Sequence, residues 1–96
     1  MEILLDGREM TDRAALHDHL SDRFAFPAYY GRNLDALYDL LTAYPEQTLV
    51  TVIHTKQMLD HLGRYGIAFL QTLEDAARAN AHLSISIFDG KNENKA

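Results

Sequence analysis

Apolar residues along the chain follow two kinds of pattern. Three short apolar runs, at residues 2–5, 49–53 and 83–88, predict β-strands. In four other segments the apolar residues recur every three or four positions, as they do on one face of a helix. Strands that alternate with helices pair in parallel through right-handed crossovers. The pattern therefore predicts a two-layer α/β fold, with a three-stranded parallel sheet and about four helices packed mainly on one face.

Turn and capping residues place the ends of the predicted helices. The first helix follows an N-cap at Thr11 or Asp12 and ends before Pro27, because the residue before a proline avoids helical geometry. The second follows an N-cap at Asn33 and ends before Pro45. The other two helices are predicted at residues 57–62 and 66–80.

Two further expectations concern the second strand and the proline before it. The run at residues 49–53 is rich in β-branched residues and nearly all apolar, which is typical of a strand buried on both faces. Tyr44 precedes Pro45, and an aromatic residue before proline permits a cis peptide bond, although most such bonds in folded proteins are trans.

The helix that begins after Asn33 has two unlike faces. At about 100° per residue, its leucines fall on one side and are expected to be buried there. The opposite side gathers two carboxylates, an aromatic ring and a hydroxyl within roughly 100°. These residues are Asp35, Tyr38, Asp39 and Thr42. An exposed face of this composition is suited to binding a surface rich in cations.

Asp39 is the member of this face that the local sequence explains least. No Lys or Arg lies three or four positions away to form a helical ion pair with it. It also lies beyond the first turn, where the helix dipole favours a carboxylate, whereas Asp35 lies within that turn. Tyr38 lies between the two aspartates and cannot belong to the core if the leucines do. An exposed tyrosine in this setting is typical of an interface anchor.

Charge and composition exclude several classes of function. Fourteen acidic against nine basic residues give a formal net charge of −5, without any cluster of Lys and Arg. Direct nucleic-acid binding is therefore not expected, whereas an acidic protein is steered toward basic protein partners. The chain has no cysteine, no apolar run near the ~20 residues of a membrane-spanning helix, and no signal-peptide pattern at its start. We expect a cytoplasmic protein with no membrane partner.

The sequence contains no recognised catalytic or metal-binding motif, so neither a metal nor a cofactor is expected. An enzyme that uses Asp35 and Asp39 as a carboxylate pair is an alternative hypothesis. An outer helix face, however, offers no concave pocket for a substrate. The histidines show no metal-ligand spacing, and a surface position is the default expectation for each: His17, His19, His54, His61 and His82.

Residues 26–42 carry a resemblance to a known family. They read FPAYYGRNLDALYDLLT. This run resembles the signature of the barstar family, which has proline, any residue, tyrosine-tyrosine-glycine, any residue, asparagine-leucine-aspartate-alanine-leucine, an aromatic residue and aspartate. The resemblance extends over almost the whole chain, from the first strand to Phe88.

The resemblance implies a domain and a function. Residues 1–90 would form a barstar-like ribonuclease-inhibitor domain, and residues 91–96 a polar C-terminal tail. The protein would be a monomer when free and would bind one-to-one to a barnase-like ribonuclease, which is basic, secreted and guanyl-preferring. Such an immunity protein blocks the nuclease active site with acidic residues of its second helix, which mimic substrate phosphate.

The resemblance also implies which residues bind the nuclease. Asp39 matches the aspartate that takes the position of a substrate phosphate. Asn33 is expected to act mainly as the N-cap of the helix and only secondarily as a contact with the partner. On the last helix, the family's additional glutamate falls at Asp75, which is therefore a candidate contact, whereas we expect its neighbour Glu74 to pair with Arg78 four residues on. The other matching positions are Tyr29, Asp35, Tyr38 and Thr42.

Two departures from the barstar pattern bear on the choice of partner. Tyr38 stands where barstar carries tryptophan. Residues 43–46 read AYPE, where barstar has a glycine and a tryptophan, so that Glu46 is only an additional candidate contact. These departures favour a third hypothesis, in which a barstar-fold interaction module binds a basic protein other than a barnase-type ribonuclease.

Overall fold

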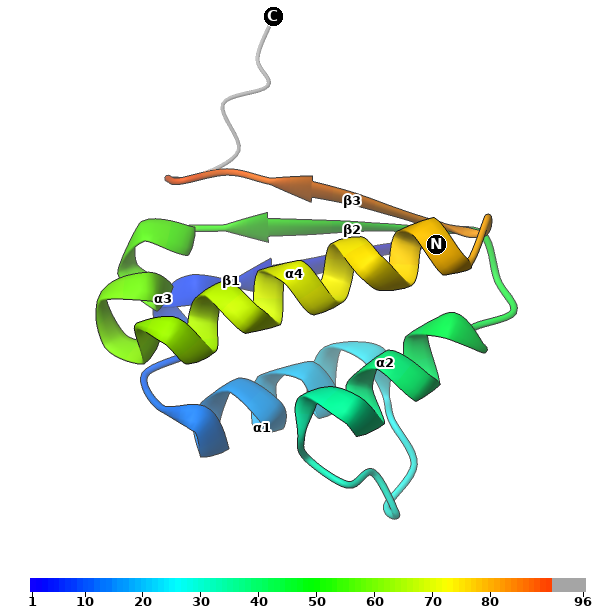
Figure 1. The fold of residues 1–96 in the computed structure, drawn as a ribbon, viewed down its shortest axis with the longest axis horizontal. Helices are drawn as coiled ribbons and strands as arrows, with labels where there is room; N and C mark the ends of the chain where they lie inside the picture. The colour runs from blue at the N-terminus through cyan, green and yellow to red at the C-terminus, as the bar shows by residue number, and fades with distance from the viewer. Residues whose placement is uncertain (91–96) are drawn as a thin grey trace, which may run out of the picture.

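The computed structural model describes residues 1–90, and every structural statement below refers to that part of the chain. It contains a three-stranded parallel sheet of order β1-β2-β3. The helices lie on one side of this sheet (Figure 1). The predicted fold class is therefore confirmed, whereas the polar tail predicted at residues 91–96 lies outside the described residues. The strands are β1 (Glu2–Asp6), β2 (Thr48–Ile53) and β3 (Leu83–Ile87), and the α-helices are α1 (Arg13–Phe24), α2 (Leu34–Thr42), α3 (Thr55–Leu62) and α4 (Arg64–Ala79).

Most element boundaries lie within two residues of the prediction, and the differences have local causes. Helix α3 begins at Thr55, directly after His54, whose backbone is left-handed with φ of 55°. Gly63, with φ of 57°, separates α3 from α4, which begins at Arg64. Asp12 rather than Thr11 caps α1, because its carboxylate accepts a hydrogen bond from the Ala15 backbone N–H at 2.8 Å. After β1, Asp6 caps a single 3-10 turn, η1 (Gly7–Glu9).

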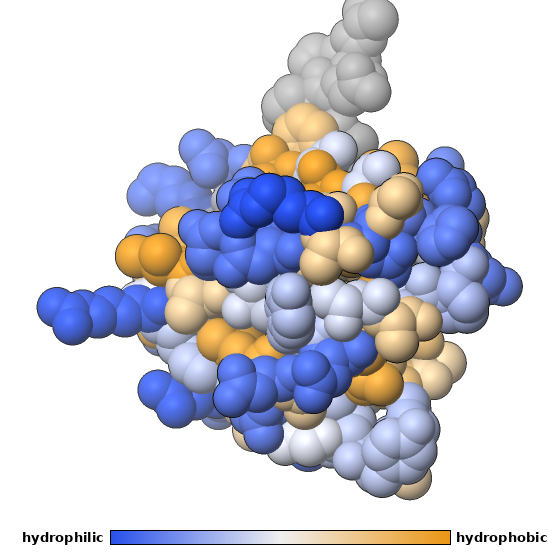
Figure 2. All heavy atoms as spheres, turned by 45° about the vertical axis from the view of Figure 1, so that its right-hand side comes forward, coloured by the Kyte–Doolittle hydropathy of each residue, from blue (hydrophilic) through white to orange (hydrophobic). Residues whose placement is uncertain are grey.

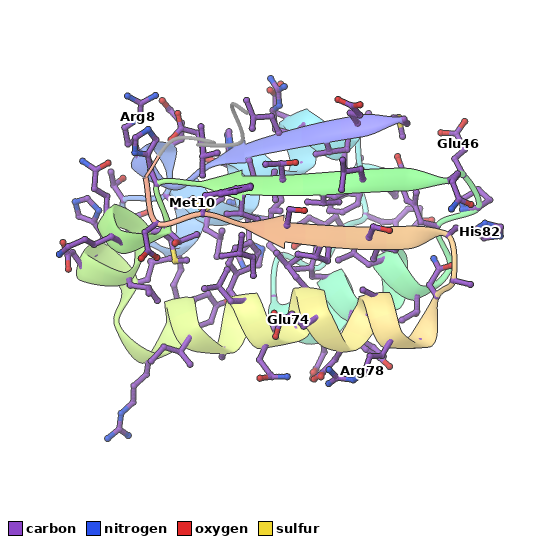
Figure 3. The ribbon with its side chains drawn as sticks, turned by 90° about the horizontal axis from the view of Figure 1, so that it is seen from above. Arg8, Met10, Glu46, Glu74, Arg78 and His82 are labelled. Atoms are coloured by element: carbon purple, nitrogen blue, oxygen red, sulfur yellow. The ribbon has the colours of Figure 1, made fainter. Side chains whose placement is uncertain are left out.

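The sheet is covered on one face only. Ile3 of β1 pairs with Val50 of β2, and both are buried against the helices. On the opposite face, Leu4 and Leu49 are 44% and 38% exposed. Viewed from above, that face of the sheet is nearest the viewer, with no helix in front of it (Figure 3). The expectation that β2 is buried on both faces is therefore wrong, because an apolar run alone does not reveal how many helical layers cover a strand.

The core between the sheet and the helices follows the predicted apolar spacing. Each of α1, α2 and α4 buries the side predicted to be apolar, at Leu16, Leu20, Phe24, Leu37, Leu41, Phe69 and Leu73. All peptide bonds of residues 1–90 are trans, so Tyr44–Pro45 is not cis. In the same part of the chain, no helix has the length and apolar character that crossing a membrane requires.

Candidate functional site

Helix α2 presents the acidic face that the sequence predicts. Leu37 and Leu41 are fully buried beneath it, and this fixes the rotation of the helix about its axis. Asp35, Tyr38 and Asp39 are consequently exposed on the outer side. Asn33 caps the helix, since its side-chain oxygen accepts a hydrogen bond from the Ala36 backbone N–H at 2.7 Å. The face is therefore held by the core below it and by the cap at its start.

A groove lies between α2 and α4. Its volume is about 520 Å³, and it brings together Asp35 and Tyr38 of α2 with Asp75 of α4. The remaining lining residues are Leu34, Thr72, Arg78 and Ala79. Three of the predicted binding residues, from two helices distant in the sequence, thus share one concave surface.

A second, smaller hollow lies on the other side of α2. It measures about 170 Å³ and brings Asp39 together with Tyr29 of the preceding loop. The Tyr29 side chain is 82% exposed, whereas its neighbour Tyr30 is buried in the core. Helix α2 is therefore a ridge with a hollow on each side, and each hollow contains one of its two aspartates.

Two of the predicted binding residues line neither hollow. The Asn33 side chain is occupied by the helix cap and also donates to the Gly31 carbonyl oxygen at 3.3 Å. The Thr42 hydroxyl donates to the carbonyl oxygens of Tyr38 and Asp39, at 2.9 and 3.2 Å. The candidate contact Glu46 is exposed in the connection before β2, at one end of the molecule (Figure 3). None of these three residues lines either hollow.

The acidic residues of the site differ in how their charge is compensated. Among residues 1–90, neither Asp35 nor Asp39 takes part in an ion pair. Asp75 does, because its Oδ1 contacts the Arg78 guanidinium and also accepts a hydrogen bond from Gln71 Nε2 at 2.9 Å. The two carboxylates of α2 are therefore free to meet a cationic partner.

The predicted pairing of Glu74 with Arg78 is wrong. Arg78 pairs with Asp75, three positions away instead of four. Both spacings bring side chains together on a helix, but Asp75 and Arg78 share the groove wall. Glu74 and Arg78 leave α4 in different directions (Figure 3).

The surface on this side of the molecule is mixed in character. Hydrophilic side chains dominate it, and hydrophobic areas are small and separated (Figure 2). Within residues 1–90, no three His, Asp or Glu side chains gather in a way that could hold a metal ion. The surface is therefore polar, and its exposed carboxylates on α2 are those of Asp35 and Asp39.

Two comparisons match this chain to known proteins. The family model described as "Barstar (barnase inhibitor)" matches residues 1–89. The chain belongs to the barstar family. It is also 40% identical over 76 residues to the Bacillus subtilis (strain 168) protein named "Putative ribonuclease inhibitor YrdF", a match that covers 78% of this chain and 84% of that protein. Barstar proteins are inhibitors rather than enzymes, and the resemblance carried by residues 26–42 is confirmed.

The loop that precedes α2 in this barstar-family chain is anchored to α1. Tyr30 Oη lies 2.6 Å from His17 Nδ1, and His17 Nε2 lies 2.8 Å from Tyr65 Oη. Arg32 forms an ion pair with Asp18 at 2.7 Å. Its guanidinium also donates to the Ala14 carbonyl oxygen at 3.2 Å. Both anchors directly follow Tyr29, so the backbone that carries its exposed ring is fixed on its C-terminal side.

His17 contradicts the expectation of a surface histidine. Its side chain is buried, with both ring nitrogens hydrogen-bonded to tyrosine hydroxyls. Burial lowers the pKa of His17, and the nearby charge of Arg32 lowers it further. Burial likewise raises the pKa of Tyr30. His17 and Tyr30 are therefore neutral near pH ~7, and they join the loop before α2 to the core.

We expect the free energy of unfolding to fall as the pH drops below ~6.5, the ordinary pKa of histidine. Burial lowers the pKa of both His17 and His19 in the folded protein. The Asp6 backbone N–H also donates to His19 Nε2 at 2.9 Å, which requires that nitrogen to be unprotonated. Below pH ~6.5 the unfolded chain binds more protons than the folded one, so protonation favours unfolding.

Urea unfolding at about pH 7.5 and about pH 5.5, on either side of the ordinary histidine pKa, measures this effect. The midpoint should be lower at the acidic pH. A variant with His17→Gln and His19→Gln should be less stable overall and should lose most of the difference between the two pH values. Equal midpoints for the unsubstituted protein would contradict the expectation.

Asn80 joins the end of α2 to the end of α4. Its buried Nδ2 donates to the Leu41 and Tyr44 carbonyl oxygens at 2.9 and 3.0 Å, and its Oδ1 accepts from the His82 backbone N–H at 3.0 Å. Asn80→Ala would leave the Tyr44 carbonyl oxygen and the His82 N–H without these partners, whereas the Leu41 carbonyl oxygen would keep its bond from the Tyr44 N–H at 3.2 Å. Because each unsatisfied buried polar group costs about 1–3 kcal/mol, we expect the free energy of unfolding to drop by about 2–4 kcal/mol. Urea unfolding, with the exposed Ser84→Ala as control, checks this; a loss under about 0.5 kcal/mol, the usual range for surface substitutions, contradicts it.

Proposed function

We propose that this barstar-family protein inhibits a secreted, basic, guanyl-preferring ribonuclease by binding it one-to-one and blocking its active site. The observation that carries the proposal is the pair Asp35 and Asp39. Both are exposed on one face of α2, and neither has an ion-pair partner within residues 1–90. In a family described by the inhibition of barnase, carboxylates placed in this way are suited to take the positions of substrate phosphates.

The chemistry of a ribonuclease active site complements this face. Such a site binds a polyanion and therefore presents cationic side chains. Charge-assisted hydrogen bonds from arginine or lysine to a carboxylate are shorter and stronger than neutral ones. The net charge of −5 would also steer the protein toward a basic nuclease and raise the association rate at low ionic strength.

The two hollows beside α2 support different proposed roles for the predicted residues. Asp39 and Tyr29 would bind a protruding cationic group in the smaller hollow, with Asp39 in the position of a phosphate. Asp35 and Tyr38 would contact the nuclease along the groove wall, with Asp75 opposite. Asn33 would act mainly through the helix cap, and Thr42 would contribute at the periphery. The inhibitor would be a monomer when free and would act in the cytoplasm, without binding RNA itself.

A titration of barnase tests this proposal. Cleavage of a fluorescent RNA substrate should fall linearly with added protein and reach the background at an equimolar ratio. Size-exclusion chromatography should give a complex with the combined mass of one copy of each protein. Full RNA cleavage in the presence of a tenfold excess of inhibitor would contradict the proposal for barnase-type nucleases.

Two observations favour a second candidate function. Arg78 places a positive charge inside the groove, and Tyr38 departs from the barstar pattern. A barstar-fold module that binds another basic protein would use the same α2 face, and its partner would present different side chains to α4. Binding to a non-nuclease basic protein through Asp39, together with failure to inhibit barnase, would support this alternative.

A further inference from the structure

The groove between α2 and α4 is not uniformly acidic. Asp35 lies on its α2 wall and has no ion-pair partner in the described part of the chain. Asp75 lies on its α4 wall, where Arg78 and Gln71 contact the same carboxylate oxygen. One wall therefore presents a free negative charge, and the other presents a negative charge that the protein itself compensates.

Arg78 can shield Asp75 without being fixed in place. Its side chain is 69% exposed and that of Asp75 is 43% exposed, so the pair is accessible to an incoming protein. Because Arg78 and Gln71 both contact Oδ1 of Asp75, a partner cation could reach only the other carboxylate oxygen without displacing them, and it would meet the positive charge of Arg78 as it approached. Rejection of a partner by like charge is a common source of specificity at protein interfaces.

We propose that Arg78 determines the specificity of this groove. It neutralises Asp75 and so selects partners that place no arginine or lysine opposite the α4 wall. The identity of the partner as a ribonuclease rests on the proposed function, whereas the shielding of Asp75 does not. A nuclease that fits this chain would present its cations to Asp35 and Asp39 and would have a neutral or acidic surface opposite Arg78.

A generic cationic probe tests the shielding without any nuclease. Hexa-arginine is titrated at low salt into the ¹⁵N-labelled protein, and amide shifts on α2 and α4 report its binding. Four forms are compared: unsubstituted, Arg78→Ala, Asp75→Asn and the double variant. Arg64→Ala is the matched control, because it changes the net charge by the same amount. Arg64 is another exposed arginine of α4, and it does not line the groove.

The expected result is a coupling between the two substitutions. Arg78→Ala should tighten hexa-arginine binding at the groove by at least about 3-fold beyond Arg64→Ala, as expected for one exposed charge interaction. Asp75→Asn should change binding by less than about 2-fold when Arg78 is present and should remove the gain when Arg78 is absent. Any of three results would overturn the proposal. Arg78→Ala and Arg64→Ala could change hexa-arginine affinity equally, or Asp75→Asn could lower the affinity equally with and without Arg78. Hexa-arginine could also cause no amide shifts at the groove in Arg78→Ala.

The same four proteins, assayed for inhibition of barnase, separate this proposal from the proposed function. Coupling with hexa-arginine but no inhibition of barnase by any form would contradict the nuclease function and leave the shielding intact. Inhibition of barnase without coupling between the Arg78 and Asp75 substitutions would contradict the proposed role of Arg78 and leave the nuclease function intact.

Discussion

Replacing Asp39 by alanine is expected to weaken the complex with barnase by at least ~30-fold, about 2 kcal/mol, which is the usual threshold for a hot-spot residue. The barnase–barstar complex is itself a reference case for such residues, so this general threshold is not a value derived from the present structure. The reason for the expected loss is that Asp39 has no ion-pair partner within residues 1–90. Its removal would leave a desolvated cation of the nuclease without a counter-charge.

Surface plasmon resonance or stopped-flow fluorescence measures this effect, with Asp60→Ala as the control. Asp60 is exposed on α3 and lines neither hollow, and its substitution changes the net charge by the same amount. The control should lower the association rate slightly and leave dissociation unchanged, because a remote charge contributes mainly to steering. A similar loss of affinity in both variants would mean that Asp39 acts only through net charge.

Replacing His17 by alanine is expected to lower the free energy of unfolding by about 2–4 kcal/mol. The substitution removes the partner of two tyrosine hydroxyls, those of Tyr30 and Tyr65. It also opens a cavity at a fully enclosed position. Unsatisfied hydroxyls and lost packing each contribute a part of this magnitude.

Urea unfolding measures the loss, and the exposed His61→Ala is a matched control that should change stability by less than about 0.5 kcal/mol. The affinity for barnase should fall as well, at a temperature where the variant is still folded. The reason is that Tyr30 holds the loop that carries Tyr29. A variant as stable as the control would show that the His17 hydrogen bonds add nothing to the fold.

Local patterns predicted the parts of this protein that depend on neighbours in the sequence. The leucine spacing of α2 fixed which face is buried, and with it the exposure of Asp35 and Asp39. The Asn33 cap and the alternation of strands with helices followed from equally local signals. These features depend on periodicity and on residues within one helical turn, which a single sequence displays.

The contacts that hold the site in place could not be predicted in this way. His17 meets Tyr65 across 48 positions, and Asn80 meets Leu41 across 39. Only the packed fold brings such residues together. Spacing likewise predicted the wrong partner for Arg78, because both Glu74 and Asp75 satisfy helical geometry and only the packed structure shows that Asp75 is the partner. The one-sided cover of the sheet also depends on the placement of whole helices.

The central claim is that the α2 face occupies the phosphate-binding site of a ribonuclease. Competition with a guanosine monophosphate bound in the barnase active site tests it most directly. The apparent Kd for the inhibitor should rise in proportion to the nucleotide concentration once the site is mostly occupied, since both ligands would require the same cationic groups. An apparent Kd that stays constant at saturating nucleotide would place the inhibitor outside the active site and contradict the claim.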